Sequence, residues 1–190
     1  MIRKALIAVS LSAALAGCVS LGPKVPETLL ALTPTAAPAA GSGASGTLAS
    51  ALVVMEPSAE ARLAVTRVPV QIDAANVAYL KKTMWVERPS RLFQRLLAET
   101  LRARGNRLVI ESDPAAGNLH LSGRLLDMGY DARTRSAVVR FDGVKESGSR
   151  VETKRFESIV PVAEAEARHV GPALNEAAND VARQVADWVG

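Results

Sequence analysis

Cysteine, histidine and aromatic residues are scarce in this 190-residue chain, which holds one cysteine, two histidines and 4% aromatic residues. A single cysteine excludes an intramolecular disulfide and any multi-cysteine metal site. His120 falls within an alternating, strand-like stretch, and His169 lies close to Glu164 and Glu166, where a loop ion pair is expected. The sequence therefore predicts no metal site and no cofactor.

Motifs for catalysis and nucleic-acid binding are missing as well. No G-x-S-x-G, H-E-x-x-H or Walker sequence occurs. The G-x-G-x-x-G match at residues 41–46 lacks a preceding strand and a following helix, so it is interpreted as linker. Asp127 and Asp131 can share a strand face, but nothing in the sequence marks them as an acid–base pair. Without such motifs, an enzyme is not expected. The net charge of +4 is not gathered into a basic stripe, so a nucleic-acid-binding protein is not expected either.

The first eighteen residues carry the clearest signal. Arg3 and Lys4 precede a short apolar run, the pattern of a secretory signal peptide, which we place at residues 1–17. The run ends in Leu15-Ala16-Gly17-Cys18, which resembles the bacterial lipobox. That resemblance implies cleavage before Cys18 and acylation of its sulfur and amino group, with palmitate-type chains anchoring the protein in a membrane. The alternative is an ordinary signal peptide with an incidental cysteine.

The chain beyond the signal peptide divides into a tether and one domain. Residues 18–46 are rich in Pro, Ala, Gly, Ser and Thr, which is typical of a flexible linker. Leu29, Leu30 and Leu32 leave open a short strand or docking segment instead. Residues 47–190 show the patterning of a single folded domain, which is large enough to be stable without disulfides.

The periodicity of this domain predicts strands, a helix, more strands and a second helix. Leu92, Phe93, Leu96, Leu97 and Leu101 form an apolar helical face after Pro89, with Gly105 beyond its end and Arg91, Gln94 and Arg95 opposite. The last helix is expected after Gly171-Pro172, with an apolar stripe from Leu174 to Trp188. Strands are expected at residues 48–55, 61–68, 77–80, 84–86, 107–111, 119–130, 136–144 and 151–162, with a turn at Asp113-Pro114.

The last three strands read as an antiparallel meander. The fold class is therefore α+β, a two-layer sandwich whose mixed or antiparallel sheet carries two amphipathic helices on one face.

A block in the first half of the domain resembles a known family. It consists of Val68-Pro69 and Asp73, a short strand ending in Tyr79, and Trp85, Glu87 and Pro89 leading into the amphipathic helix. Together with the lipobox and linker, this block is similar to the ABC-type transport auxiliary lipoproteins. The sequence departs from the family pattern at Ala74, where an Arg commonly follows, and at Arg88, which is an extra residue.

The resemblance implies a non-enzymatic subunit of an envelope lipid-transport system. Its partners would be an MCE-domain (mammalian-cell-entry-like) protein and an ABC permease with its ATPase. By bacterial sorting rules, Val19 in place of Asp favours the periplasmic face of the outer membrane. The partner surface would include Val68, Pro69, Asp73, Tyr79, Trp85, Glu87 and Pro89, although Tyr79 and Trp85 can equally be core residues. A homo-oligomer would also fit a ring-shaped partner.

Two other functional classes stay open at this stage. A structural outer-membrane lipoprotein that docks on a secretion, pilus or cell-wall assembly would use the basic face of the first helix. A periplasmic hydrolase would need a site that the motifs do not reveal.

Overall fold

The computed structural model describes residues 29–111 and 117–190. The expected signal peptide, Cys18 and the Asp113-Pro114 turn lie outside the described residues. Within the described ranges, no helix is both long enough and apolar enough to cross a bilayer.

A long central strand, β6 (Leu119–Asp131), organises the mixed eight-stranded sheet. Three short strands pair in parallel with successive parts of one of its edges: β1 (Leu52–Val54), β2 (Ser58–Ala59) and β3 (Pro69–Gln71). The other edge pairs antiparallel with β7 (Ser136–Ser147), which pairs in turn with β8 (Arg150–Pro161). The sheet is extended by β4 (Val77–Tyr79) beside β3 and by β5 (Val109–Glu111) beside β1. The expected meander of the last three strands is confirmed.

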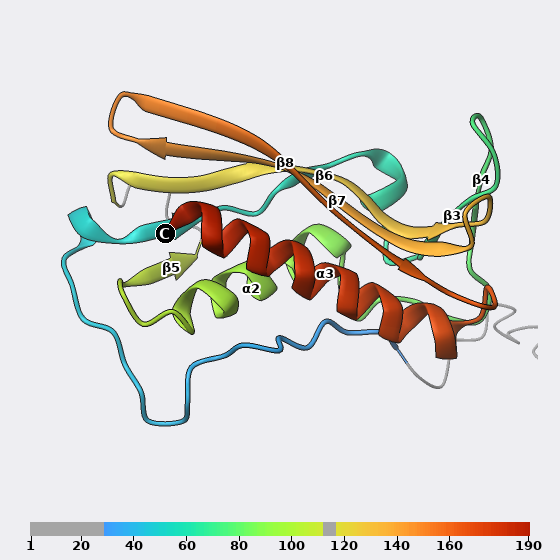
Figure 1. Cartoon of the computed structure of the whole chain (residues 1–190), viewed down its shortest axis with the longest axis horizontal. Helices are drawn as coiled ribbons and strands as arrows, with labels where there is room; N and C mark the ends of the chain where they lie inside the picture. The colour runs from blue at the N-terminus through green and yellow to red at the C-terminus, as the bar shows by residue number, and fades with distance from the viewer. Residues whose placement is uncertain (1–28, 112–116) are drawn as a thin grey trace, which may run out of the picture.

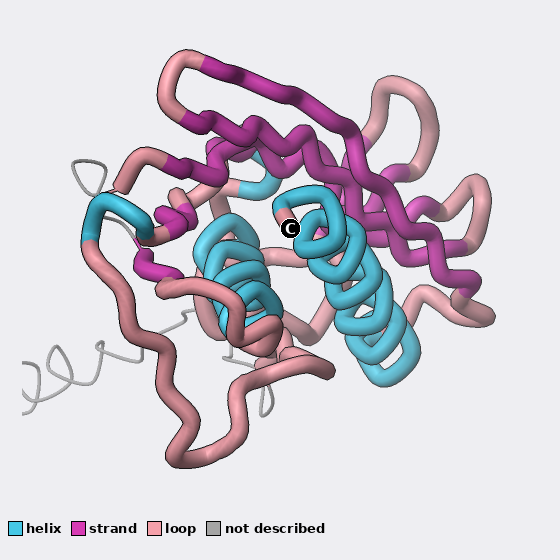
Figure 2. The backbone as a smooth tube through the Cα atoms, turned by 60° about the vertical axis from the view of Figure 1, so that its left-hand side comes forward, coloured by secondary structure: helices cyan, strands magenta, loops and turns pink. Residues whose placement is uncertain are grey.

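Two helices cover one face of this sheet, as the sequence predicts. They are α2 (Pro89–Arg102) and α3 (Ala167–Val189). Figure 1 shows both helices beneath the strands, and Figure 2 shows the sheet curling over them. The α+β two-layer architecture is therefore confirmed, and the core lies between the sheet and the helices.

Four of the seven aromatic side chains form a continuous cluster in that core. Phe93 of α2 meets Phe141 of β7 edge-on, with ring centroids 5.3 Å apart. Phe156 of β8 follows at 6.4 Å from Phe141, and Trp188 of α3 lies 5.5 Å from Phe156. These rings connect four elements, so scarce aromatic residues are concentrated where burial stabilises the fold most.

The first helix follows its sequence pattern except at one position. Leu92, Phe93, Leu96, Leu97 and Leu101 are all buried, and Gly105 takes a left-handed φ of 67° just past the helix. Gln94 was expected on the exposed face, but it is 4% exposed. Its side-chain amide donates to the carbonyl oxygen of Val54 at 2.9 Å, which satisfies a backbone group at the end of β1.

The strand predicted at residues 61–68 is wrong, because the structure has a 3-10 turn, η3 (Ala61–Leu63), followed by a loop. On the edge of β6 that carries β2 and β3, no described strand pairs between Leu125 and Tyr130, and a β-bulge between Leu125 and Asp127 in the ladder with β7 lies in the same stretch. The guanidinium of Arg62 occupies this place and donates to the carbonyl oxygen of Leu126 at 2.8 Å. A side chain therefore replaces a strand at the bulge.

Three other predicted boundaries need correction. The strand expected from Leu48 begins at Leu52, after a 3-10 turn, η2 (Leu48–Ser50). The strand expected at residues 84–86 is a single β-bridge between Trp85 and Leu30. The last helix begins at Ala167 rather than after Pro172, because the carbonyl oxygen of Glu166 accepts the first helical bonds and Val170 is fully buried. This packing offsets the backbone bond that Pro172 cannot make.

Residues 29–35 are held against the domain. Leu30 donates its N–H to Met84 and accepts from Val86, at 2.8 and 2.9 Å. Asn179 of α3 binds the segment further on, accepting from the N–H of Thr35 at 2.7 Å and donating to the carbonyl of Thr33 at 3.0 Å. Of the two interpretations left open for Leu29 to Leu32, the structure shows a docking segment, whereas residues 37–46 are exposed. In Figure 1 this blue segment passes both helices.

Candidate interaction site

The block that resembles the auxiliary lipoproteins folds as the β3–β4 hairpin followed by the entry to α2. Pro69 is opposite Tyr79 in the hairpin, and the N–H of Leu80 donates to the carbonyl of Val68 at 2.9 Å. Val68, Pro69 and Pro89 are buried. These three residues therefore shape the fold and present no surface to a partner.

Close packing of backbone on backbone holds the hairpin to the sheet. A Cβ at Gly129 of β6 would lie 2.5 Å from the carbonyl oxygen of Pro69 and 2.8 Å from its Cγ. Only glycine permits this approach. Pro69 therefore requires a glycine at position 129 of the strand that lies beside it.

Trp85 is a core residue with an unusual feature. It is 2% exposed, and its N–H donates to the carbonyl of Thr66 at 2.7 Å. Its indole Nε1 is buried without a hydrogen-bond partner among residues 29–111 and 117–190. A buried donor of this kind costs about 1–3 kcal/mol. The burial of Trp85 supports the core alternative that the sequence left open.

The solvent-accessible residues of the block lie in two places. Asp73 caps the hairpin turn, and its carboxylate accepts from the N–H groups of Ala75 and Asn76 at 2.8 and 2.9 Å. These contacts, together with hydrogen bonds from the side-chain amide of Asn76, lower the pKa of Asp73. Tyr79 is half-buried beneath Arg67, whose guanidinium carbon lies 3.9 Å from the ring centroid. Both residues belong to the hairpin.

Glu87 is the accessible residue at the start of α2. Arg95 donates to its Oε1 at 2.6 Å, and Arg91 Nε lies 3.5 Å from its Oε2. The hydrogen bond from Arg95 is the main reason that the pKa of Glu87 is lowered. Arg88, Arg91 and Arg95 have 55%, 57% and 46% of their side chains exposed. This basic group, which we call the α2 basic face, suits an acidic protein surface.

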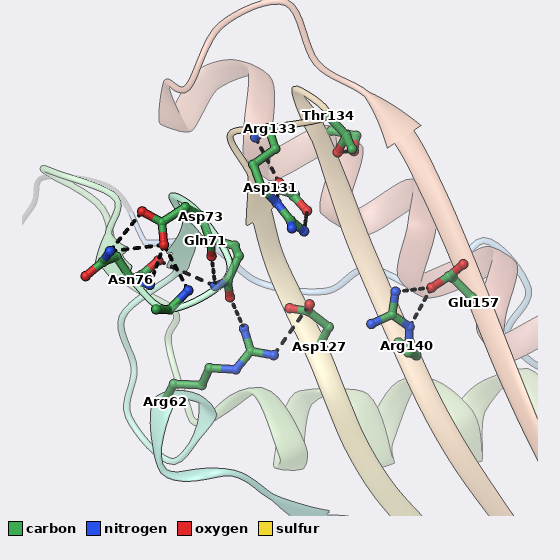
Figure 3. A network of polar contacts seen from close by, with 12 residues as sticks. Arg62, Gln71, Asp73, Asn76, Asp127, Asp131, Arg133, Thr134, Arg140 and Glu157 are labelled. Atoms are coloured by element: carbon green, nitrogen blue, oxygen red, sulfur yellow. Dashed lines mark hydrogen bonds and ion pairs between the residues drawn. The ribbon is translucent and has the colours of Figure 1, made fainter.

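A second polar network covers the sheet face that the helices leave open (Figure 3). Arg62 reaches both Gln71, at 3.2 Å, and Asp127, at 3.5 Å. Arg140 of β7 pairs with Glu157 of β8 beside them. Asp127, Asp131 and Glu157 each contact an arginine, so these ion pairs join parts of the sheet rather than presenting free charge.

Asp127 and Asp131 have pKa values shifted in opposite directions, which the sequence did not indicate. Burial raises the pKa of Asp127 despite the opposing charge of Arg62. The hydrogen bond from Arg133 lowers the pKa of Asp131, with Nη2 2.6 Å from Oδ2. Separated values can mark an acid–base pair. Four residues of strand span about 13 Å, however, so these carboxylates cannot act on one bond.

His169 lies in an exposed group of charged side chains at the start of α3. Its Nδ1 lies 3.6 Å from Glu164 Oε2, so the expected contact with Glu164 is present, but His169 belongs to the first turn of α3 rather than to a loop. Glu164, Glu166 and His169 have ligand atoms close enough for a metal ion. All three are exposed, and Arg168 already contacts both glutamates, at 3.4 and 2.9 Å. This exposed cluster is explained by ion pairing.

One family model matches most of this chain. The family model for the ABC-type transport auxiliary lipoprotein component matches residues 29–186. The chain belongs to this family. Its match begins at Leu29, the first residue of the docked segment. Auxiliary lipoproteins of this kind are envelope proteins associated with ABC transporters. Among curated proteins, none matches the chain significantly.

Solved structures similar to this auxiliary lipoprotein support its fold. Protein XCC0632 from Xanthomonas campestris, of family DUF330, has 16% identity and a TM-score of 0.72 over 85% of this chain and 93% of its own. An uncharacterized protein has 12% identity and a TM-score of 0.66 over 76% and 95%. A PelC dodecamer from Paraburkholderia phytofirmans has 13% identity over 74% and 90%, but its TM-score of 0.39 supports no conclusion.

Sequence reasoning missed two features of this auxiliary lipoprotein. Asn179, 3% exposed, joins α3 to residues 33–35, and a lone Asn on a buried helical stripe was the available signal. Arg62 donates a hydrogen bond to the carbonyl oxygen of Leu126 in β6, and the alternation of residues 61–68 did not indicate this contact.

Proposed function

We propose that this auxiliary lipoprotein is a non-catalytic subunit that fixes the periplasmic component of an MCE-type ABC lipid transporter at the outer membrane. The family match carries the link to an ABC transporter. The lipobox-like Leu15–Cys18 sequence supports acylation of Cys18, and Val19 supports the outer membrane. The MCE-domain protein, the permease and the ATPase are the partners that fit this role.

The α2 basic face is the contact surface that we propose for the transporter. Three motif residues lie next to the start of α2: Trp85, Glu87 and Pro89. Trp85 and Pro89 are buried, as are Val68 and Pro69 of the same block, so Glu87 is the accessible one of the three. Glu87 holds Arg91 and Arg95 at defined positions on an exposed helix. A rigid helix face with placed charges favours one orientation of an acidic partner. A ring of several copies around the transporter would be compatible with this surface.

Photo-crosslinking in native envelopes tests this surface. A photoreactive residue at position 91 of the full-length lipoprotein is expected to capture a transporter subunit. The same residue at position 153, on the exposed outer side of β8, is the matched control. Capture of a secretion, pilus or cell-wall protein from position 91 would instead support the structural-lipoprotein alternative, and equal capture from both positions would contradict the assignment of the surface.

A further inference from the structure

An open groove lies between the β3–β4 hairpin and the start of α3. It has a volume of ≈ 680 Å³ and is lined mainly by apolar groups, among them Val70, Ile72, Ala78 and Leu80. Three basic residues, Lys81, Lys82 and Arg168, and the acidic Glu166 also line it. Figure 1 shows the hairpin and the start of α3 at the same end of the molecule, away from the C-terminus.

This end combines exposed apolar and basic groups. Ile72 is 46% exposed and Val77 is 41% exposed, next to the hairpin turn. Lys81 and Lys82 directly follow the hairpin, and among the described residues neither has an acidic partner within ion-pair distance. The nearby Glu164 and Glu166 are engaged by Arg168. Apolar side chains flanked by unpaired lysines are suited to the headgroup region of an anionic bilayer.

The first described residues of the chain lie near this end. Leu30 binds the backbone of Met84 and Val86, only a few residues after Lys82. Its side chain also packs against Gly171, because a Cβ there would lie 2.8 Å from Leu30 Cδ2. Residues 19–28 connect Cys18 to Leu29, and so short a chain spans at most about 40 Å. A membrane-held Cys18 therefore limits the distance between this end of the domain and the lipid to at most about 40 Å.

We propose that this hairpin end docks on the anionic phospholipid surface of the membrane that holds the anchor. The proposal rests on the acylation of Cys18. Ile72 and Val77 enter the headgroup region, Lys81 and Lys82 bind lipid phosphates, and the groove faces the bilayer. Docking fixes the orientation of the domain, and with it the positions of the α2 basic face and the β7–β8 hairpin relative to the membrane.

Single introduced thiols test this orientation in the full-length lipoprotein. Cys18 is the only cysteine, so its acylation leaves an introduced thiol as the only labelling site. A polarity-sensitive fluorophore on Val77→Cys is compared with the same fluorophore on Ser149→Cys, in the exposed β7–β8 turn. The protein is reconstituted in phosphatidylcholine vesicles with or without phosphatidylglycerol, and nitroxide-labelled headgroups act as the quencher.

We expect a blue shift and strong quenching at position 77 with phosphatidylglycerol, and neither at position 149. Equal quenching at the two positions would overturn the proposal. A blue shift at position 77 that depends on protein concentration, without quenching, would also overturn it, because a second copy would then cover the hairpin. Two labels per chain would show a free Cys18 thiol, which refutes the anchor by a separate measurement.

Lysine variants test the electrostatic part. Each lysine near an anionic surface contributes about 1 kcal/mol, which corresponds to roughly a fivefold effect. Lys81→Gln/Lys82→Gln should therefore lower the docked-to-free ratio about 30-fold. The matched control, Arg150→Gln/Lys154→Gln at the β7–β8 end, should leave it unchanged. Unchanged quenching in the lysine variant would contradict phosphate binding.

Discussion

Substitutions of Trp85 test how its buried indole contributes to the stability of the block that resembles the auxiliary lipoproteins. Trp85→Ala removes one of the largest fully buried side chains, and such truncations cost about 3–5 kcal/mol. Trp85→Phe keeps a ring in the core and removes the buried Nε1–H, which has no acceptor in the part of the chain that the structure describes. Relief of about 1–3 kcal/mol offsets the lost ring contacts. We expect Trp85→Phe to stay within about 1 kcal/mol of the wild type.

Urea denaturation of the chain from residue 19 onward gives both values. With a slope of about 1–3 kcal/mol per M, Trp85→Ala should lower the midpoint by one molar or more, whereas Trp85→Phe should barely move it. Equal losses for the two variants would refute the reasoning about the unpaired donor. A stable Trp85→Phe variant that no longer binds the transporter would instead support the interpretation of Trp85 as a partner contact.

Three further predictions concern stability. Gly129→Ala should cost about 1–3 kcal/mol in urea denaturation, because its Cβ would collide with Pro69. Asn179→Ala should speed proteolysis within residues 29–46 while the rest of the domain resists, because residues 33–35 lose their hydrogen bonds to α3. Asp127→Asn should gain stability relative to the wild type as the pH rises from 3 to 7: burial raises the folded-state pKa of Asp127, so its contribution falls as pH rises through that value.

Each of these predictions has a matched control. Gly43→Ala has open space around its Cβ and should leave stability unchanged. Asn118→Ala, at an exposed position, should leave proteolysis of residues 29–46 unaffected. Asp142→Asn should show the opposite pH trend, because the hydrogen bond from Arg155 lowers the pKa of Asp142. A shared trend for Asp127→Asn and Asp142→Asn would contradict the assigned causes.

The elements with strong periodicity were predictable from the sequence. The face of α2 and the meander of β6, β7 and β8 depend on contacts within or between neighbouring segments, and their patterns are long. The short strands β2 and β3 depend instead on which part of β6 is free to pair. That tertiary condition has no local sequence signal, so the strand predicted at residues 61–68 is wrong, and the side chain of Arg62 contacts this part of β6 instead.

The site was predictable only in outline. The motif residues Val68, Pro69 and Trp85 stand out in the sequence because the fold needs them, whereas a contact surface is defined by exposure. Exposure separated Glu87 and the arginines of α2 from the buried part of the motif. The opposite pKa shifts of Asp127 and Asp131 likewise depend on the fold. Burial raises the pKa of Asp127, and a hydrogen bond from Arg133 lowers the pKa of Asp131.

We propose that this lipoprotein works with an MCE-type ABC transporter at the outer membrane. Mild-detergent affinity purification of the tagged full-length protein from native envelopes, followed by mass spectrometry, tests it most directly. We expect an MCE-domain protein, a permease and its ATPase to co-purify, and intact mass to show acylation of Cys18. Recovery of the lipoprotein alone, or with a secretion, pilus or cell-wall component, would contradict the claim.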